Sequence, residues 1–247
     1  MRKKAANLTG KQNIVWRSHE PSRLETFSDG VFAFAVTLLM ISIEVPHTFT
    51  ELFGVFKGVL SFVACFAILF LIWNSQNLFF RRYGINDSYT TFLNAALLFV
   101  VLIYVYPLKF LFVAWLGGGD NTILQNGRVI PIITIQQLPT LMYLYHAGYF
   151  AVYLIFLLMY SYARKKAHEV GLTPEEIFET DSLIIINAVN CALAAVAASV
   201  VLFVKPEYSG TSGMIYTSIP VIYTILFSVR GKMRRKKFGG ITANELA

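Results

Sequence analysis

The chain alternates between long apolar stretches and short polar segments that carry most of the charge. Six apolar stretches run roughly over residues 27–45, 52–80, 91–116, 138–163, 183–204 and 214–229. A helix needs about 20 apolar residues to cross the ~30 Å hydrocarbon core of a bilayer, and every stretch except the first reaches or approaches that length. The pattern predicts an all-α membrane protein with six transmembrane helices per subunit.

The first apolar stretch is short between its charged ends. Fourteen uncharged residues, 30–43, separate Asp29 from Glu44. At about 1.5 Å per residue they cover roughly 21 Å, less than the bilayer core. Such a helix suits the interior of an assembly, with water at both ends, as a pore requires. Alternatively, Asp29 and Glu44 reach the two interfaces of a locally thinned membrane.

The composition and the placement of charge favour a membrane protein over a nucleic-acid-binding one. Of the 247 residues, 56% are hydrophobic and 14% are charged, whereas soluble domains carry about 25% charged residues. The net charge is +7, but 17 of the 21 Lys and Arg residues fall on one side of the membrane if both termini lie there. By the positive-inside rule, we expect a multi-pass protein of the cell membrane with cytoplasmic termini and no nucleic-acid partner.

Local signals divide the chain into three parts. Residues 22–25 (Ser-Arg-Leu-Glu) have the spacing of a capping box, so the first helix should begin near Arg23. We therefore expect a basic cytoplasmic N-terminal segment (1–22) whose first 20 residues are poorly ordered, a six-helix transmembrane domain (23–230) and a basic cytoplasmic tail (231–247). Because the polar segment precedes the first apolar stretch, no cleavable signal peptide is expected. Thr173 and the Pro-Glu-Glu after it predict a short helix in the loop before residue 181.

One motif is more specific than the hydropathy pattern. Arg23, three further residues, and then Phe27-Ser28-Asp29 are followed, eight residues after the Asp, by Thr37-Leu-Leu. This arrangement closely resembles the first-helix signature of the transmembrane protein 175 family of potassium channels. The six-helix layout and the length resemble the prokaryotic, single-repeat members, while the motif evidence covers residues 23–46 and Trp73.

The resemblance implies a potassium-selective or potassium-preferring channel that conducts passively and needs no cofactor, with the K+ ion as permeant species. It implies a homotetramer in the bilayer whose first helices line a central pore. By register with the family, the constriction positions are Phe34, Thr37 or Leu38, and Ile41. Spacings of three, four and seven residues place such a set on one helix face. The Thr37 hydroxyl has an alternative role, a hydrogen bond to a carbonyl one turn earlier.

Two positions depart from the family pattern. Relatives commonly carry Ile or Leu at the first constriction, where this chain has Phe34. They also tend to place a His shortly after the Trp of the second helix, whereas residues 74–77 are Asn-Ser-Gln-Asn here. The narrowest point of the pore and the partner of Trp73 therefore stay open at this stage.

The charged motif residues need partners outside their own helix. Arg23 and Asp29 are six residues apart, about 240° around a helix, so they cannot pair well. A buried Asp29 requires a donor from another helix, and Trp73, Gln76 and Asn77 lie at the right depth. We expect a structural network that holds the first helix, formed by Arg23, Phe27, Ser28, Asp29, Trp73 and Gln76. Direct ion binding by Asp29 is the alternative.

Other features bear on the outer mouth and on competing functions. Glu44 would form an acidic ring at the outer mouth of a tetramer, unless it faces lipid headgroups. A proton- or cation-coupled secondary transporter is the alternative function, but it needs an ionisable residue near mid-membrane, and no apolar stretch has an acidic residue at its centre. A non-transporting scaffold is a third class. Enzymatic activity is not expected, because no cluster of His, Asp or Glu has metal or nucleophile spacing.

Overall fold

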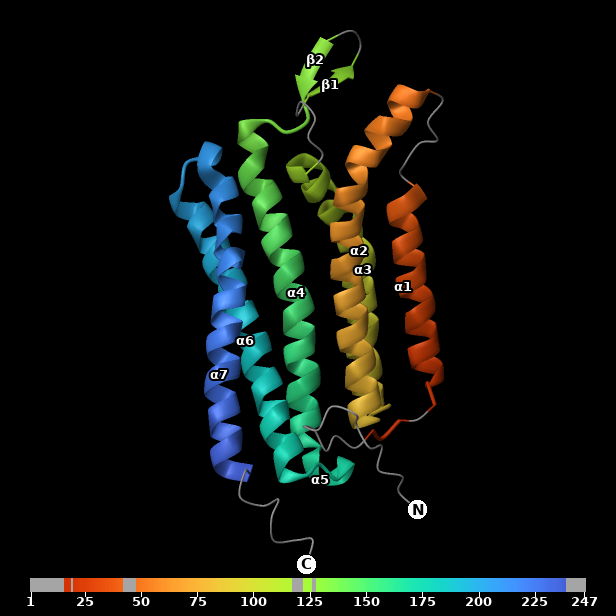
Figure 1. Cartoon of the computed structure of the whole chain (residues 1–247), viewed down its shortest axis with the longest axis vertical. Helices are drawn as coiled ribbons and strands as arrows, with labels where there is room; N and C mark the ends of the chain where they lie inside the picture. The colour runs from red at the N-terminus through yellow and green to blue at the C-terminus, as the bar shows by residue number, and fades with distance from the viewer. Residues whose placement is uncertain (1–15, 19, 42–47, 117–121, 126–127, 239–247) are drawn as a thin grey trace, which may run out of the picture.

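The computed structural model describes residues 16–18, 20–41, 48–116, 122–125 and 128–238. Long helices lie side by side in an elongated bundle (Figure 1), with a two-stranded antiparallel hairpin at one end. The elements are α1 (Arg23–Ile41), α2 (Phe49–Tyr83), α3 (Ser88–Leu116), β1 (Thr122–Gln125), β2 (Arg128–Pro131), η1 (Ile135–Gln137), α4 (Leu138–Lys165), α5 (Ala167–Val170), α6 (Pro174–Phe203), η2 (Pro206–Ser218) and α7 (Ile219–Phe238).

The expected all-α membrane fold is confirmed. Within the described residues, five segments are long and apolar enough to cross a bilayer: Val59–Tyr83, Ser88–Ala114, Ile135–Lys165, Pro174–Phe203 and Pro206–Phe238. The helix α1 is not among them, and its first two turns carry three charged residues, Arg23, Glu25 and Asp29.

The basic residues of three separate segments meet at one end of the bundle, which we call the basic end. Its members are Arg81, Arg82, Arg164, Lys165, Lys166, Arg230 and Arg234, from the end of α2, the end of α4 and the second half of α7. The start of α1, the end of α7 and the short helix α5 lie at the same end, at the bottom of Figure 1. The folded chain therefore has a strongly asymmetric distribution of positive charge along the bundle axis.

Capping boxes fix where two helices begin. At α1, the Ser22 amide donates to Glu25 Oε1 (2.9 Å) and the Glu25 amide donates to Ser22 Oγ (3.2 Å). At α6, Thr173 and Glu176 form the same reciprocal pair. The first boundary is as predicted. The prediction of a short helix after Thr173 was wrong, because this cap opens α6, whose 30 residues continue through the apolar stretch without a break.

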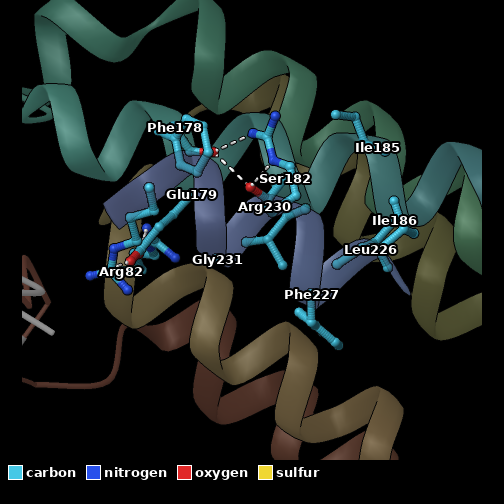
Figure 2. Close-up of a pocket in the computed structure, with 12 residues that line it drawn as sticks. Arg82, Phe178, Glu179, Ser182, Ile185, Ile186, Leu226, Phe227, Arg230 and Gly231 are labelled. Atoms are coloured by element: carbon cyan, nitrogen blue, oxygen red, sulfur yellow. Dashed lines mark hydrogen bonds and ion pairs between the residues drawn. The ribbon is translucent and has the colours of Figure 1, made fainter. Parts of the chain in front are cut away.

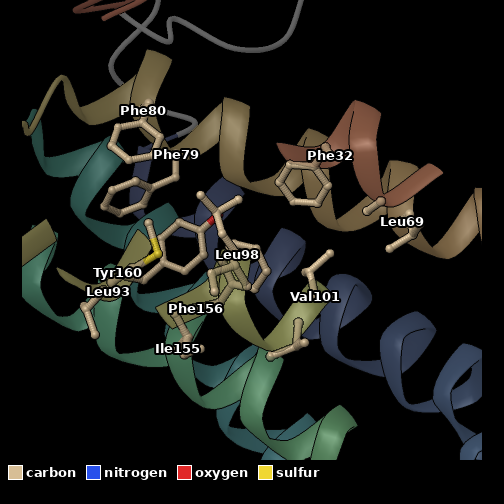
Figure 3. Close-up of a cluster of buried hydrophobic side chains, with 14 of the residues drawn as sticks. Phe32, Leu69, Phe79, Phe80, Leu93, Leu98, Val101, Ile155, Phe156 and Tyr160 are labelled. Atoms are coloured by element: carbon tan, nitrogen blue, oxygen red, sulfur yellow. The ribbon is translucent and has the colours of Figure 1, made fainter. Parts of the chain in front are cut away.

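The main core lies between α1, α2, α3 and α4. Phe79 packs edge to face against Phe80 and Tyr160 in its half near the basic end, and Phe32 of α1 belongs to the same core, to one side of them in Figure 3. Lipid tails are as apolar as these side chains, so close van der Waals packing rather than escape from water holds such helices together. The helix α1 contacts α2 and α3 and stands at one flank of the bundle (Figure 1).

Part of the N-terminal segment is anchored at the basic end. The guanidinium of Arg17 donates to both carboxylate oxygens of Glu176, at 2.8 and 3.0 Å, and its backbone amide donates to the Arg81 carbonyl. The prediction that the first 20 residues are poorly ordered was wrong for residues 16–18, because this chelate and the carbonyls around it fix their position. At the other terminus, α7 continues to Phe238, past the boundary expected at residue 231.

Candidate pore helix and its anchoring network

The helix α1 has two different faces. One face packs into the core, where Phe32, Ala35 and Leu39 are 4%, 0% and 1% exposed. The opposite face is exposed in the single chain and carries Gly30, Ala33, Phe34, Thr37 and Met40. Phe34 is 56% exposed although it lies two residues from the buried Phe32. The periodicity of burial thus leaves one complete face of α1 without a partner from its own chain.

The structure separates the constriction residues expected from the sequence. Phe34 and Thr37 lie on the exposed face. Leu38 is half-buried and packs against the main core. Ile41 ends the helix, but its side chain, like all of Glu44, lies outside the described residues.

The Thr37 hydroxyl donates to the Ala33 carbonyl at 2.9 Å, one turn earlier in α1. This is the alternative role considered for Thr37. A hydroxyl has one donor and two acceptor lone pairs, so this bond uses the proton and leaves the lone pairs of Oγ1 available. The same rotamer therefore presents an oxygen acceptor on the exposed face of α1.

Asp29 receives a hydrogen bond from a neighbouring helix. The indole Nε1 of Trp73 on α2 donates to Asp29 Oδ1 at 2.6 Å. The sequence analysis offered three donors at the membrane depth of Asp29, namely Trp73, Gln76 and Asn77, and Trp73 is the partner in the structure. A hydrogen bond to a charged acceptor is shorter and stronger than a neutral one. This bond ties the first turns of α1 to α2.

A second polar connection joins α1, α2 and α3 inside the core. Gln76 Nε2 donates to Asn94 Oδ1 (2.9 Å), Asn94 Nδ2 donates to Ser28 Oγ (2.8 Å), and Ser28 Oγ donates to the Leu24 carbonyl (2.8 Å). The side chains of Gln76, Asn94 and Ser28 are at most 1% exposed. Asn94 was missed by the sequence analysis, although a lone amide in the apolar stretch 91–116 was a usable signal.

Two members of the expected network lie elsewhere. Arg23 is exposed, and its side chain makes no hydrogen bond to another described residue. Phe27 is 64% exposed and points away from the core. The polar contacts therefore run through Ser28, Asp29, Trp73 and Gln76, with Asn94 as the added centre.

The far end of α1 is held by a cation that the sequence analysis did not select. Lys109 Nζ on α3 donates to the carbonyl of Leu39 at 2.7 Å. The last carbonyls of a helix lack partners and carry partial negative charge, so an ammonium is favourable there. The helix α1 is thus fastened to α2 and α3 by polar contacts near both of its ends. Among the described residues there is no group of three His, Cys, Asp or Glu able to hold a metal ion.

Comparisons with known proteins match this chain to potassium channels. The profile of the family described as "Endosomal/lysosomal potassium channel TMEM175" matches residues 23–107, which include α1, α2 and most of α3. The chain is 36% identical to a potassium channel of Marivirga tractuosa over 241 residues, which cover 96% of this chain and 97% of the relative. A potassium channel of Chamaesiphon minutus is 34% identical over 96 residues, 36% of this chain and 47% of that relative.

Solved structures show the same fold. A crystal structure of a threonine-to-alanine variant of the potassium channel MtTMEM175, bound to a nanobody fusion protein, superposes with a TM-score of 0.74 at 34% identity, covering 92% of this chain and 98% of that one. A lysosomal potassium-selective channel homologue from Chamaesiphon minutus superposes with a TM-score of 0.52 at 20% identity, covering 84% and 96%. The second likeness concerns the fold alone.

Proposed function

This chain belongs to the TMEM175 family, and from that premise we propose that it is a passive, potassium-preferring cation channel of the cell membrane. The observation that carries the proposal is the exposed face of α1, with Phe34 and Thr37 on it. A helix that lines a pore must be fixed from behind and must leave its front to the permeation path. The contacts of Asp29 and Ser28 on α1, with Trp73 and Asn94 behind it, supply that fixation.

The pore in this proposal is formed by several copies of the chain. One helix face cannot enclose an ion path, and closed cyclic symmetry brings identical faces around one axis. The helix α1 stands at a flank of the bundle, where copies can approach one another (Figure 1). Four copies would give rings of four Phe34 and four Thr37 side chains, and Ile41 continues the same register toward the end of α1. The family resemblance supports the tetramer.

Selectivity in this pore arises from a narrow apolar constriction. A ring of Phe34 side chains excludes water and gates by dewetting, so a permeating ion must lose part of its hydration shell. Potassium loses its shell at lower cost than sodium and is favoured. The Oγ1 lone pairs of Thr37, one turn further along, offer acceptors that replace part of the lost water.

The charged residues set the sidedness of the channel. We assign the basic end to the cytoplasm, since positive residues concentrate there. In this proposal Asp29 positions α1 through the hydrogen bond that its Oδ1 accepts from the Trp73 indole. Glu44, which follows α1, provides an acidic ring at the outer mouth that concentrates cations.

Ion flux into liposomes tests the proposal. Purified protein is reconstituted under opposing potassium and sodium gradients, with a voltage-sensitive dye as readout. A potential that follows the potassium gradient without any second ion is the expected result. A response that requires a proton or sodium gradient would instead indicate a coupled transporter, and no dependence of flux on protein dose would indicate a scaffold.

A further inference from the structure

A cavity between α2, α6 and α7 at the basic end is not explained by ion conduction. Its volume is about 240 Å³, and it is lined by three arginines, Glu179, Ser182 and a wall of aliphatic and aromatic side chains. Figure 2 shows Arg230 of α7 directed at the Phe178 and Ser182 positions of α6, with Leu226 and Ile186 further along the two helices. The cavity is therefore polar at one end and apolar at the other.

Arg230 is held in place by neutral partners. Its Nε donates to Ser182 Oγ (2.8 Å), its Nη2 donates to the Phe178 carbonyl (2.9 Å), and its guanidinium lies 4.0 Å from the centre of the Phe178 ring. No carboxylate pairs with Arg230 among the described residues, and its Nη1 has no hydrogen-bond partner there. A fixed guanidinium with unused donors is suited to binding an anion.

The other charges of the cavity do not cancel that of Arg230. Arg82 pairs with Glu179 (2.6 Å), and Arg234 pairs with Glu175 and Glu179. Counted over the described residues of these pairs, three arginines meet two carboxylates, so one positive charge is in excess. The Nε of Arg82 is buried and has no hydrogen-bond partner among the described residues. Both features favour an additional anionic acceptor in the cavity.

The position of the apolar wall identifies the kind of anion. Ile186 on α6 and Leu226 on α7 lie about one turn deeper in the bundle than Ser182 and Arg230. Within the described residues α7 has no buried side chain, and Phe227 beside the cavity is 60% exposed. A ligand in this cavity has its charge at the level of the arginines and its apolar part directed toward the membrane.

The flank that carries the cavity faces lipid in the proposed channel. The helix α7 lies on the opposite side of the bundle from α1 (Figure 1), so it points away from a pore lined by α1. This step rests on the proposed function. We propose that the cavity binds the phosphate of an anionic phospholipid, with Arg230 as the principal donor and the apolar wall against the first part of an acyl chain. The shared chemistry, a phosphate anion, is also offered by free phosphate.

Native mass spectrometry of the purified full-length protein tests the proposal. Phosphatidylglycerol and phosphatidylcholine with identical acyl chains are titrated against wild type, Arg230→Gln and the matched control Arg235→Gln, which removes the same charge from an exposed position on α7. We expect wild type to bind phosphatidylglycerol more tightly than phosphatidylcholine. Arg230→Gln should lower the affinity for phosphatidylglycerol about tenfold, because charge-assisted hydrogen bonds are lost. Arg235→Gln should change that affinity less than about twofold. Equal losses in both variants would overturn the site.

Two further measurements distinguish bound lipid from free phosphate, and loss of the site from a folding defect. Leu226→Trp keeps all three arginines and fills the apolar part of the cavity, so it should also lose phosphatidylglycerol. Inorganic phosphate added to wild type should leave the bound lipid in place, and complete displacement by phosphate would overturn the lipid assignment. Native mass spectrometry counts bound lipid directly, so lipid binding can be measured even if the channel conducts no ions. Ion flux can likewise be measured in a variant that no longer binds the lipid.

Discussion

The indole nitrogen of Trp73 lies 2.6 Å from Oδ1 of Asp29, and this contact joins α1 to α2 across 44 residues of sequence. The donor comes from the neighbouring helix, and a hydrogen bond to a carboxylate oxygen is stronger than one between neutral groups. The role of Asp29 is therefore to set the position and rotation of α1. The orientation of Phe34 and Thr37, one and two turns further along, depends on that rotation.

Substitutions at Asp29 separate positioning from ion binding. Asp29→Asn keeps an oxygen that accepts from Trp73, whereas Asp29→Ala removes it. We expect Asp29→Asn to retain most of the potassium preference in liposome flux and Asp29→Ala to lose it. Trp73→Phe, which removes the donor and keeps an aromatic ring, should behave like Asp29→Ala. Equal loss of potassium flux in Asp29→Asn and Asp29→Ala, with no effect of Trp73→Phe, would assign Asp29 to ion binding.

Asn94 is the centre of the buried polar connection, and its replacement should affect selectivity as well as stability. Asn94→Ala leaves Gln76 and Ser28 without their partner, at a cost of about 1–2 kcal/mol for hydrogen bonds inside a membrane protein. Ser61→Ala is the control, because Ser61 Oγ donates to the Phe112 carbonyl (2.9 Å) and connects only α2 and α3. Both variants should lower the thermal unfolding midpoint in detergent, and only Asn94→Ala should change the potassium-to-sodium preference.

A similar change in selectivity in Ser61→Ala would contradict this assignment. It would mean that any loosening of the helix bundle alters the pore, and that the contacts to α1 have no special role.

Thiol labelling distinguishes Thr37 from Leu38. The two native cysteines, Cys65 and Cys191, are buried, so background reaction with a charged thiol reagent should be low. In Thr37→Cys the new thiol lies on the exposed face of α1, and we expect the reagent to block potassium flux. Leu38→Cys packs against the core and should react slowly. Faster block of Leu38→Cys than of Thr37→Cys would require α1 to be rotated in the assembled channel.

Asp87 provides a pH-dependent contribution to stability at the basic end. Burial by itself raises the pKa of this carboxyl, but hydrogen bonds from the Tyr162 hydroxyl, the Thr90 amide and the Lys166 ammonium outweigh burial, so the pKa lies below its ordinary value. The stabilisation is therefore complete above the unfolded-state pKa of about 3.9 and is lost as the pH falls through the lower, folded-state pKa.

We expect Asp87→Asn to lower the unfolding midpoint at pH 7 by about 2–4 °C, equivalent to about 1 kcal/mol. The difference from wild type should shrink as the pH falls below about 4. Glu169→Gln is the control, because Glu169 is 70% exposed and pairs with the same Lys166 at 3.3 Å. A difference between Asp87→Asn and wild type that stays constant down to the lowest accessible pH would contradict this account.

The sequence predicted much of the fold because its signals are local. The capping box at Ser22 and Glu25 placed the start of α1 at Arg23, and apolar length identified the long helices. The same locality explains one error. The cap at Thr173 was recognised, but the charged residues that follow it were read as a loop, whereas they form the first turns of α6 at the basic end.

The anchoring network was only partly predictable, because it depends on contacts between helices. Position along the membrane normal predicted that Trp73 or Gln76 donates to Asp29, but it could not decide between them. In the structure Trp73 donates to Asp29, and Gln76 donates to Asn94 instead. The lysine that caps α1, Lys109, lies 70 residues from the carbonyl it contacts. Pairings at that separation follow from the rotation and packing of helices, and no periodicity within one helix encodes them.

Phe34 tests the central claim, that the exposed face of α1 forms the selective constriction. The measurement is the zero-current potential of reconstituted channels under opposing potassium and sodium gradients, for wild type, Phe34→Asn and Phe99→Asn. Phe99 on α3 is the matched control, because it is 65% exposed and Phe34 is 56% exposed. The account predicts that Phe34→Asn wets the constriction, raises leak and moves the potential toward zero, while Phe99→Asn keeps the wild-type value. An unchanged potential in Phe34→Asn would contradict it.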